Sequence, residues 1–216
     1  MGFGDLDSVF QLRVKTRLYT PLIIKSGQEG ELTDSLVQKT PDNRVHIGGY
    51  PLSSLFVRAF KRLKNNRNIH ERIDTKGDKV SQFWVESSFI DGVEYNIVPG
   101  IKIDRRYGTA SETALYSDEV VSAGHEFEMR INFLFNQKES NFCDLAELFS
   151  QGLGVIDSGI ENIGGYWSYG YGRLKILDAK YRVLDLKKGE HTGLLWNFAD
   201  ESLPFNELVV LPPTSD

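Results

Sequence analysis

The sequence has few of the residues that most enzymes use for metal binding or covalent catalysis. It contains one cysteine, Cys143, which excludes an internal disulfide. Its four histidines are His46, His70, His125 and His191, and no two of them have the spacing of a zinc site. A GxSxG elbow, a Walker loop and a strand–helix dinucleotide fingerprint are also missing. These absences exclude the common zinc, serine-hydrolase and nucleotide-binding enzyme classes.

Long apolar runs are missing as well. No stretch of about 18 or more apolar residues occurs, so we expect neither a membrane-spanning helix nor a membrane partner. The N-terminus, MGFGDLDSVFQ, has two early acidic residues but no apolar core of a signal peptide and no Ser or Thr of a myristoylation site. Together with the single cysteine, these features predict a protein of a reducing cytoplasm.

Charge is distributed unevenly along the chain. The net charge of −5 argues against a general polyanion binder. However, residues 58–72 hold six Lys or Arg and one Glu, whereas the chain from Glu190 onward holds no Lys or Arg. Because local basic density governs phosphate binding, the total charge says nothing against a nucleic-acid partner.

The hydrophobic pattern predicts a single domain, residues 1–216, with six elements in the order β-α-β-β-α-β. The predicted strands and helices are 10–24, 82–90, 126–135 and 173–186, and 51–66 and 141–154, respectively. This order is that of a ferredoxin-like α+β fold, a four-stranded antiparallel sheet with both helices on one face. Two insertions interrupt it, a long polar loop at 25–48 and a segment at 91–122. Residues 187–216 form an acidic, proline-containing tail that we expect to pack loosely.

Two interpretations fit the start of helix 51–66. Ser53 and Ser54 open the helix, and Arg58 and Arg62 lie off its apolar stripe. These residues form either a phosphate clamp at a helix N-terminus or an ordinary solvated face.

Two more segments can each be interpreted in two ways. IDRRYGTA places Arg105 and Arg106 beside a Tyr-Gly turn, either to contact phosphate or to form a surface salt-bridge cluster. GIENIGGYWSYGYG, followed by Arg173, is either a tight turn whose aromatic residues cap the core or a loop that approaches phosphates closely. In the second case Tyr169 and Tyr171 are available to stack on bases.

The order of these pieces resembles that of the RAMP superfamily. More narrowly, it is similar to the repeating backbone subunits of type III CRISPR effector complexes, of the Csm and Cmr kinds. The resemblance spans residues 12–185, and the matching segments are 21–27, Asp34, 47–58, 103–110, 121–127 and 164–173.

This resemblance implies a modified, RRM-like fold in which segment 91–122 is a thumb-like hairpin that wedges into a guide–target duplex. It implies that such subunits stack along a CRISPR RNA in the cytoplasm of a prokaryote. The expected partners are CRISPR RNA, single-stranded target RNA, other RAMP subunits and a large subunit. The protein then holds the RNA backbone while base pairing selects the target. The implied RNA-binding residues are Ser53, Ser54, Arg58, Arg62, Arg105, Arg106, Tyr169, Tyr171 and Arg173.

The resemblance also assigns catalysis to Asp34, in the 25–48 loop. In active members an Asp of this loop supports metal-dependent cleavage of the bound target RNA, once per subunit. One carboxylate suffices to position a hydrated Mg²⁺, so no dedicated metal cluster is expected. On composition alone Asp34 is a turn residue, and a non-catalytic backbone subunit is therefore an alternative. The residues also leave room for an endoribonuclease that processes precursor CRISPR RNA with His46, or for an unrelated ferredoxin-like domain.

The sequence departs from the family pattern in three places. Phe56 and Val57 replace a basic residue and a glycine of the helix entry, and Tyr169 replaces the Arg before GYGR. Ser35-Leu36 replaces the Asn-Pro that follows the loop Asp. These departures predict a divergent subtype or a specialised position in the filament.

Overall fold

The fold is built on one mostly antiparallel sheet. The computed structural model describes residues 6–31, 33–63, 81–104, 106, 109–138 and 141–212. Within them, five strands form a sheet in the order β3-β7-β1-β8-β9. These strands are β1 (Ser8–Leu18), β3 (Phe83–Val85), β7 (Glu126–Phe135), β8 (Leu174–Asp185) and β9 (Asn206–Glu207). The remaining elements are α1 (Gly49–Arg62), α3 (Phe142–Asp157), α4 (Gly189–Thr192), β2 (Val45–Ile47), β4 (Ser88–Ile90), β5 (Tyr95–Asp104) and β6 (Thr109–Val121).

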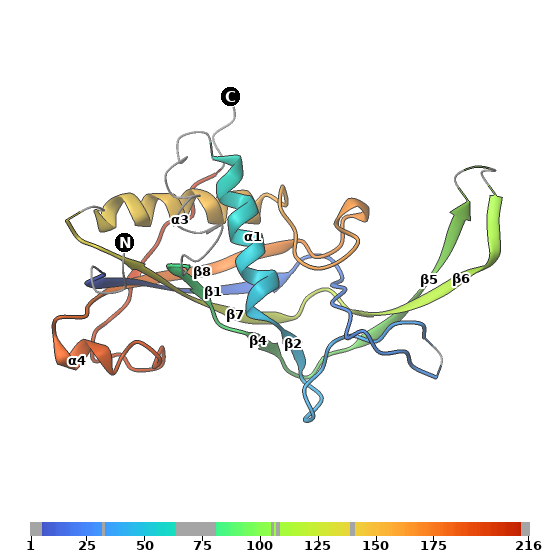
Figure 1. Cartoon of the computed structure of the whole chain (residues 1–216), viewed down its shortest axis with the longest axis horizontal. Coiled ribbons are helices and arrows are strands. Elements are labelled where there is room, and N and C mark those ends of the chain that lie inside the picture. The colour runs from blue at the N-terminus through green and yellow to red at the C-terminus, as the bar shows by residue number, and fades with distance from the viewer. Residues whose placement is uncertain are drawn as a thin grey trace.

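The predicted α+β fold is confirmed. The four predicted strands, numbered 1 to 4 in chain order, correspond to β1, β3, β7 and β8. They lie side by side in the order 2-3-1-4, and every neighbouring pair is antiparallel. This is the ferredoxin-like arrangement. Helices α1 and α3 lie on one face of the sheet (Figure 1).

The core lies between that face and the two helices. The apolar residues that alternate along β7 are all buried, namely Phe127, Met129, Ile131, Phe133 and Phe135. Most of the apolar stripe of α1 is buried as well, namely Leu52, Leu55, Phe56, Ala59 and Phe60. Phe149 of α3 is central, since its ring lies 5.2 Å from that of Phe10 and 5.3 Å from that of Phe60. A Cβ at Gly152 would overlap the Phe60 ring, so this glycine allows the close approach of α1 and α3.

Two predicted strands end earlier or divide. β1 stops at Leu18, and Leu22, which follows it, pairs instead with Val121 at the end of β6 while its side chain remains in the core. The predicted strand 82–90 is divided between β3, which pairs with β7, and β4, which pairs with β2.

The insertion at 91–122 forms a long two-stranded hairpin. β5 and β6 pair along most of their length, and the hairpin projects away from the sheet (Figure 1). Among the described residues, the base of the hairpin bonds to the rest of the domain, where residues 117–121 meet Leu22, Tyr166 and the 25–48 loop.

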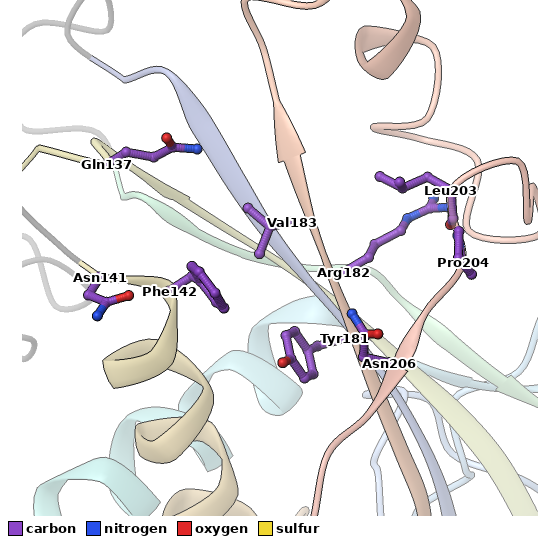
Figure 2. Close-up of a pocket in the computed structure, with 9 residues that line it drawn as sticks. All are labelled: Gln137, Asn141, Phe142, Tyr181, Arg182, Val183, Leu203, Pro204 and Asn206. Carbon is purple, nitrogen blue, oxygen red and sulfur yellow. The ribbon is translucent and has the colours of Figure 1, made fainter.

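The expectation of a loosely packed tail is wrong. Arg182 of β8 has only 1% exposure and extends toward Leu203 of the tail (Figure 2). Its guanidinium donates to the Gln11 side chain and to the carbonyls of Asp200, Leu203, Leu194 and Asn197. Phe198 is buried as well. The tail therefore packs on the face of the sheet opposite the helices, and β9 then carries it around the edge of the sheet toward α3.

The far end of the tail contacts α3. Ser150 donates a hydrogen bond to the carbonyl of Val209 and accepts one from the amide of Leu211. Gly154 lies against the Leu211 carbonyl, where a Cβ would overlap it. No helix in the described part of the chain is long and apolar enough to cross a membrane.

Candidate functional site

Asp34 lies at the base of the hairpin, against β6. Its Oδ2 accepts hydrogen bonds from the backbone amide of Ser117 at 2.6 Å and from the Ser117 hydroxyl at 3.3 Å. The amide of Asp34 donates to the Ser117 carbonyl at 2.9 Å. Asp34 is exposed, and no hydrogen bond from the described residues reaches its Oδ1. One oxygen is therefore held by β6, whereas the other has no hydrogen-bond partner among the described residues.

The loop around Asp34 is packed in the absence of RNA, although it is long and polar. Its residues Thr33, Ser35 and Val37 are buried. Glu119 of β6 accepts the amide of Val37 at 3.0 Å and the Nζ of Lys39 at 2.8 Å. The hairpin base therefore sets the conformation of the loop.

A buried carboxylate, Asp118, lies next to these contacts. Its Oδ1 accepts the Nζ of Lys25 at 2.9 Å, and its Oδ2 accepts the hydroxyl of Tyr166 at 2.7 Å. The pKa of the Tyr166 hydroxyl is raised, first by burial and then by its hydrogen bond to Asp118. Sequence reasoning missed this group. The only signal was a run of polar residues, Ser117-Asp118-Glu119, inside a strand.

The predicted residues of α1 come together around one acid. Glu161, near the start of the glycine–aromatic loop, accepts the Nε of Arg58 at 2.9 Å and the Nε of Arg62 at 2.8 Å. Arg58 also donates to the hydroxyl of Ser54 at 2.8 Å and to the carbonyl of Asn162 at 2.6 Å. The side chains of Arg58 and Arg62 are still 41% and 62% exposed, so each presents part of its guanidinium to solvent.

Ser53 faces a different side of α1. It lines a cavity of about 450 Å³ between the start of the helix and β3, together with Ser54, Tyr50 and Trp84. Gly49 allows the start of α1 to lie close to β3, because a Cβ at this position would overlap the Val85 carbonyl.

Several glycines of the 159–172 loop serve its packing. Gly164 and Gly172 have φ of +82° and +71°, and a Cβ would overlap the carbonyls of Ile23 and Ile163, respectively. Gly170 has φ of +82° with open space beside it. The backbone conformation of the loop therefore favours glycine at these positions whether or not a phosphate binds there.

The aromatic residues of this loop do not all cap the core. Tyr169 is 78% exposed and Trp167 is 69% exposed, whereas Tyr166 is turned inward. Tyr171 is half-buried, and the exposed Arg173 packs its stem along Gly159. Tyr169 and Trp167 therefore present ring faces to solvent.

Arg106 is exposed at the tip of the hairpin, and Arg105 lies outside the described residues. The hairpin also exposes Ile97, Ile101 and Leu115, an apolar surface that sequence reasoning did not single out. Ile101 and Leu115 are directly paired across the two strands.

His46, the alternative catalytic residue, has local partners. Its ring stacks on Phe89 at 5.3 Å, and its Nδ1 lies 3.1 Å from the Gln38 amide nitrogen. These contacts give His46 a structural role in β2.

A divalent cation at Asp34 would have one exposed carboxylate oxygen as its protein ligand. Within the described residues, no three His, Cys, Asp or Glu side chains form a metal cluster. Mg²⁺ binds commonly through one or two carboxylates while it keeps several waters. The geometry of Asp34 fits that mode of binding.

Comparisons with known proteins give one family and one fold. The model of the RAMP superfamily matches residues 17–175. A comparison with curated protein sequences gives no match. Among 179 matching chains of solved structures is a chain of the type III-B Cmr-beta complex bound to cognate target RNA. The two share 14% sequence identity with a TM-score of 0.60, and the match covers 83% of this chain and 62% of that one.

Proposed function

Because the chain belongs to the RAMP superfamily, we propose that it is an RNA-binding backbone subunit of a type III CRISPR effector complex and cleaves target RNA through Asp34. Its partners are then CRISPR RNA, single-stranded target RNA, other RAMP subunits and a large subunit, in the cytoplasm of a prokaryote. The similar Cmr-beta chain comes from a complex bound to target RNA, which supports this assignment.

The observation that carries the catalytic part is the geometry of Asp34. A carboxylate that only fastened the loop to β6 would need one oxygen to accept a backbone amide. Oδ2 serves that purpose, because it accepts the amide of Ser117. Oδ1 has no hydrogen-bond partner among the described residues, and Asp34 is exposed at the junction of the loop and the hairpin. Because β6 fixes the other oxygen, this free oxygen is held in one orientation before RNA arrives.

The chemistry that suits this arrangement is attack of a ribose 2′-hydroxyl on the adjacent phosphorus. The 2′-hydroxyl loses its proton to water as the new P–O2′ bond forms and the P–O5′ bond breaks, and the leaving 5′-oxygen takes up a proton from water. The products are a 2′,3′-cyclic phosphate and a 5′-hydroxyl. A hydrated Mg²⁺ at Oδ1 would supply positive charge beside the scissile phosphate. Asp34 itself contributes orientation, since its free oxygen fixes the position of what binds there.

RNA contact is proposed for the exposed groups on the same molecule. Arg58 and Arg62 offer partly exposed guanidinium groups beside Ser54, and Arg173 follows the glycine–aromatic loop. Guanidinium groups bind phosphate through paired hydrogen bonds. Tyr169 and Tyr171 add ring faces on which bases stack.

The alternative of a non-catalytic backbone subunit is supported by one observation. The paired hydrogen bonds between Asp34 and Ser117 would be equally useful if Asp34 only fastened the loop. Two substitutions separate these functions. Asp34→Asn keeps an oxygen that accepts from Ser117 but removes the negative charge, whereas Asp34→Ala removes both.

The test uses the assembled ribonucleoprotein with a labelled target RNA and Mg²⁺. We expect both variants to bind target and to lose cleavage at regularly spaced positions. Asp178→Asn, a change at an exposed carboxylate of β8, serves as the control and should cleave normally. If Asp34→Asn cuts at the wild-type rate, the catalytic role is wrong and the non-catalytic alternative holds.

A further inference from the structure

We propose that Asp118 is a positioning residue for Asp34, because Asp118 joins three segments of the chain into one unit. The segments are the Asp34 loop, the hairpin and the glycine–aromatic loop. This role rests on the function proposed above.

Asp118 is buried, and both of its oxygens have partners. The side chain lies on β6, and the whole residue is only 1% exposed. Lys25 reaches it from the start of the Asp34 loop, and Tyr166 reaches it from the glycine–aromatic loop. The Lys25 ammonium also lies 5.3 Å from the centre of the Tyr166 ring, so the three side chains contact one another. A buried carboxylate is stable only with such partners, and removing one partner is strongly destabilising.

Tyr166 holds an unusual backbone conformation at this point. Its φ is +55°, in the left-handed region, where a residue with a large side chain is strained. The bond from its hydroxyl to Asp118 compensates for that strain. A tyrosine hydroxyl is protonated at neutral pH and can donate, and burial, followed by the hydrogen bond to Asp118, raises its pKa further.

Asp118 is connected to Asp34 through successive residues of β6. Ser117 holds the Asp34 carboxylate and amide, and the backbone of Asp118 pairs with Ser35, the residue after Asp34. Glu119 then accepts the amide of Val37. Since neighbouring residues of one strand hold neighbouring residues of the loop, a shift of β6 at Asp118 displaces the Ser117 amide and with it the free oxygen of Asp34.

The carboxylate of Asp118 is too enclosed to act on RNA directly. Its side chain is 2% exposed, and its two oxygens are already bonded within the protein. It therefore acts through Asp34 rather than as a catalytic residue.

The experiment compares Asp118→Asn and Tyr166→Phe with wild type in the assembled complex. Asp118→Asn keeps the shape but removes the charge opposite Lys25, and Tyr166→Phe removes one hydroxyl group. Asp178→Asn again provides the surface control. Each complex is assayed for target affinity, for single-turnover cleavage at saturating target, and for hydrogen exchange of residues 33–39.

We expect both variants to bind target as wild type does and to cleave about 10- to 100-fold more slowly, because misplacement by 1 Å at a catalytic group has an effect of that order. Exchange in residues 33–39 should be faster by about 5- to 30-fold, which corresponds to a loss of one or two kcal/mol. A second pair of variants changes Lys25. Lys25→Met removes the cation and should slow cleavage, whereas Lys25→Arg keeps the cation and should cleave at a rate closer to that of wild type.

The outcomes distinguish this proposal from the function on which it rests. If Asp34→Asn abolishes cleavage while Asp118→Asn and Tyr166→Phe cleave normally, the positioning role is wrong. It is also wrong if cleavage falls with no change in exchange of residues 33–39. If Asp34→Asn itself cleaves normally, the proposed catalysis fails, and the role of Asp118 fails with it.

Discussion

Substitution of Arg182 by methionine should release the C-terminal tail from the sheet. Methionine keeps most of the apolar stem but removes all of the guanidinium donors. In the native fold these donors engage the Gln11 side chain and four carbonyls of residues 194–203, at distances from 2.6 to 3.3 Å. The ring of Phe205 also lies 4.4 Å from the guanidinium carbon.

The magnitude follows from two limits. Two of the five acceptors keep another donor, since the amides of Asn197 and Asp200 donate to the carbonyls of Leu194 and Asn197, respectively. The other three acceptors would be left without this donor and would cost about 1–3 kcal/mol each if nothing moved. The tail can instead detach and hydrate those carbonyls. Detachment exposes the buried Leu194 and Phe198, at about 1.5–3 kcal/mol for each side chain. The smaller of these totals governs the outcome, and we expect a loss of about 3–5 kcal/mol, as when one partner of a buried charged network is removed.

The assay is urea unfolding followed by two signals. Far-UV circular dichroism reports the sheet and helices. Tryptophan fluorescence reports the tail, because Trp196 stacks on Trp84 of β3 with ring centroids 5.7 Å apart. In Arg182→Met the fluorescence change should occur at lower urea than the dichroism change.

The matched control is Arg130→Met. Arg130 pairs with Glu128 at 2.8 Å on the same face of the sheet, but its side chain is 46% exposed. We expect this control to lose less than about 1 kcal/mol, since exposed ion pairs contribute little. If Arg182→Met is no more destabilised than Arg130→Met, the reasoning about the buried guanidinium is refuted.

Two more predictions concern stability. Gly172→Ala should lower the midpoint of thermal unfolding more than Gly170→Ala, because both have positive φ but only Gly172 lies against a carbonyl, that of Ile163; equal shifts would contradict the packing argument. Asp7 has a pKa below its usual value, chiefly because Lys187 donates to it. Its contribution is present above about pH 4 and is lost as the pH falls through the lowered pKa, so the stability difference between wild type and Asp7→Asn in urea titrations should shrink as the pH falls from 6 to 2. A difference that stays constant over that range would contradict this assignment.

Local periodicity made the core predictable from the sequence. The bounds of β7 coincide with those predicted, because apolar and polar residues alternate through the strand and each position follows from its neighbours. The same holds for the buried stripe of α1. The order of the elements then determined the fold class.

The contacts that hold the candidate site could not be predicted in this way. Asp118 meets Lys25 and Tyr166 across separations of 93 and 48 residues, and such buried polar contacts leave no period in the sequence. The same is true of Arg182, which occupies an ordinary alternating position in β8. The packing of the tail and of the Asp34 loop depends on these residues, and the tail was therefore expected to be looser than it is.

The lateral edges of the five-stranded sheet restrict how copies of this chain can associate. β3 is three residues long and β9 two, so neither edge offers a long row of open backbone groups to a further strand. Where β8 extends beyond β9, Asp157 accepts the amide of Ile176 and His191 accepts that of Asp185. Along these described edges, a sheet that continued from one copy of this chain into the next would find few open backbone groups. If copies associate, we therefore expect the hairpin and the loops to carry the contacts.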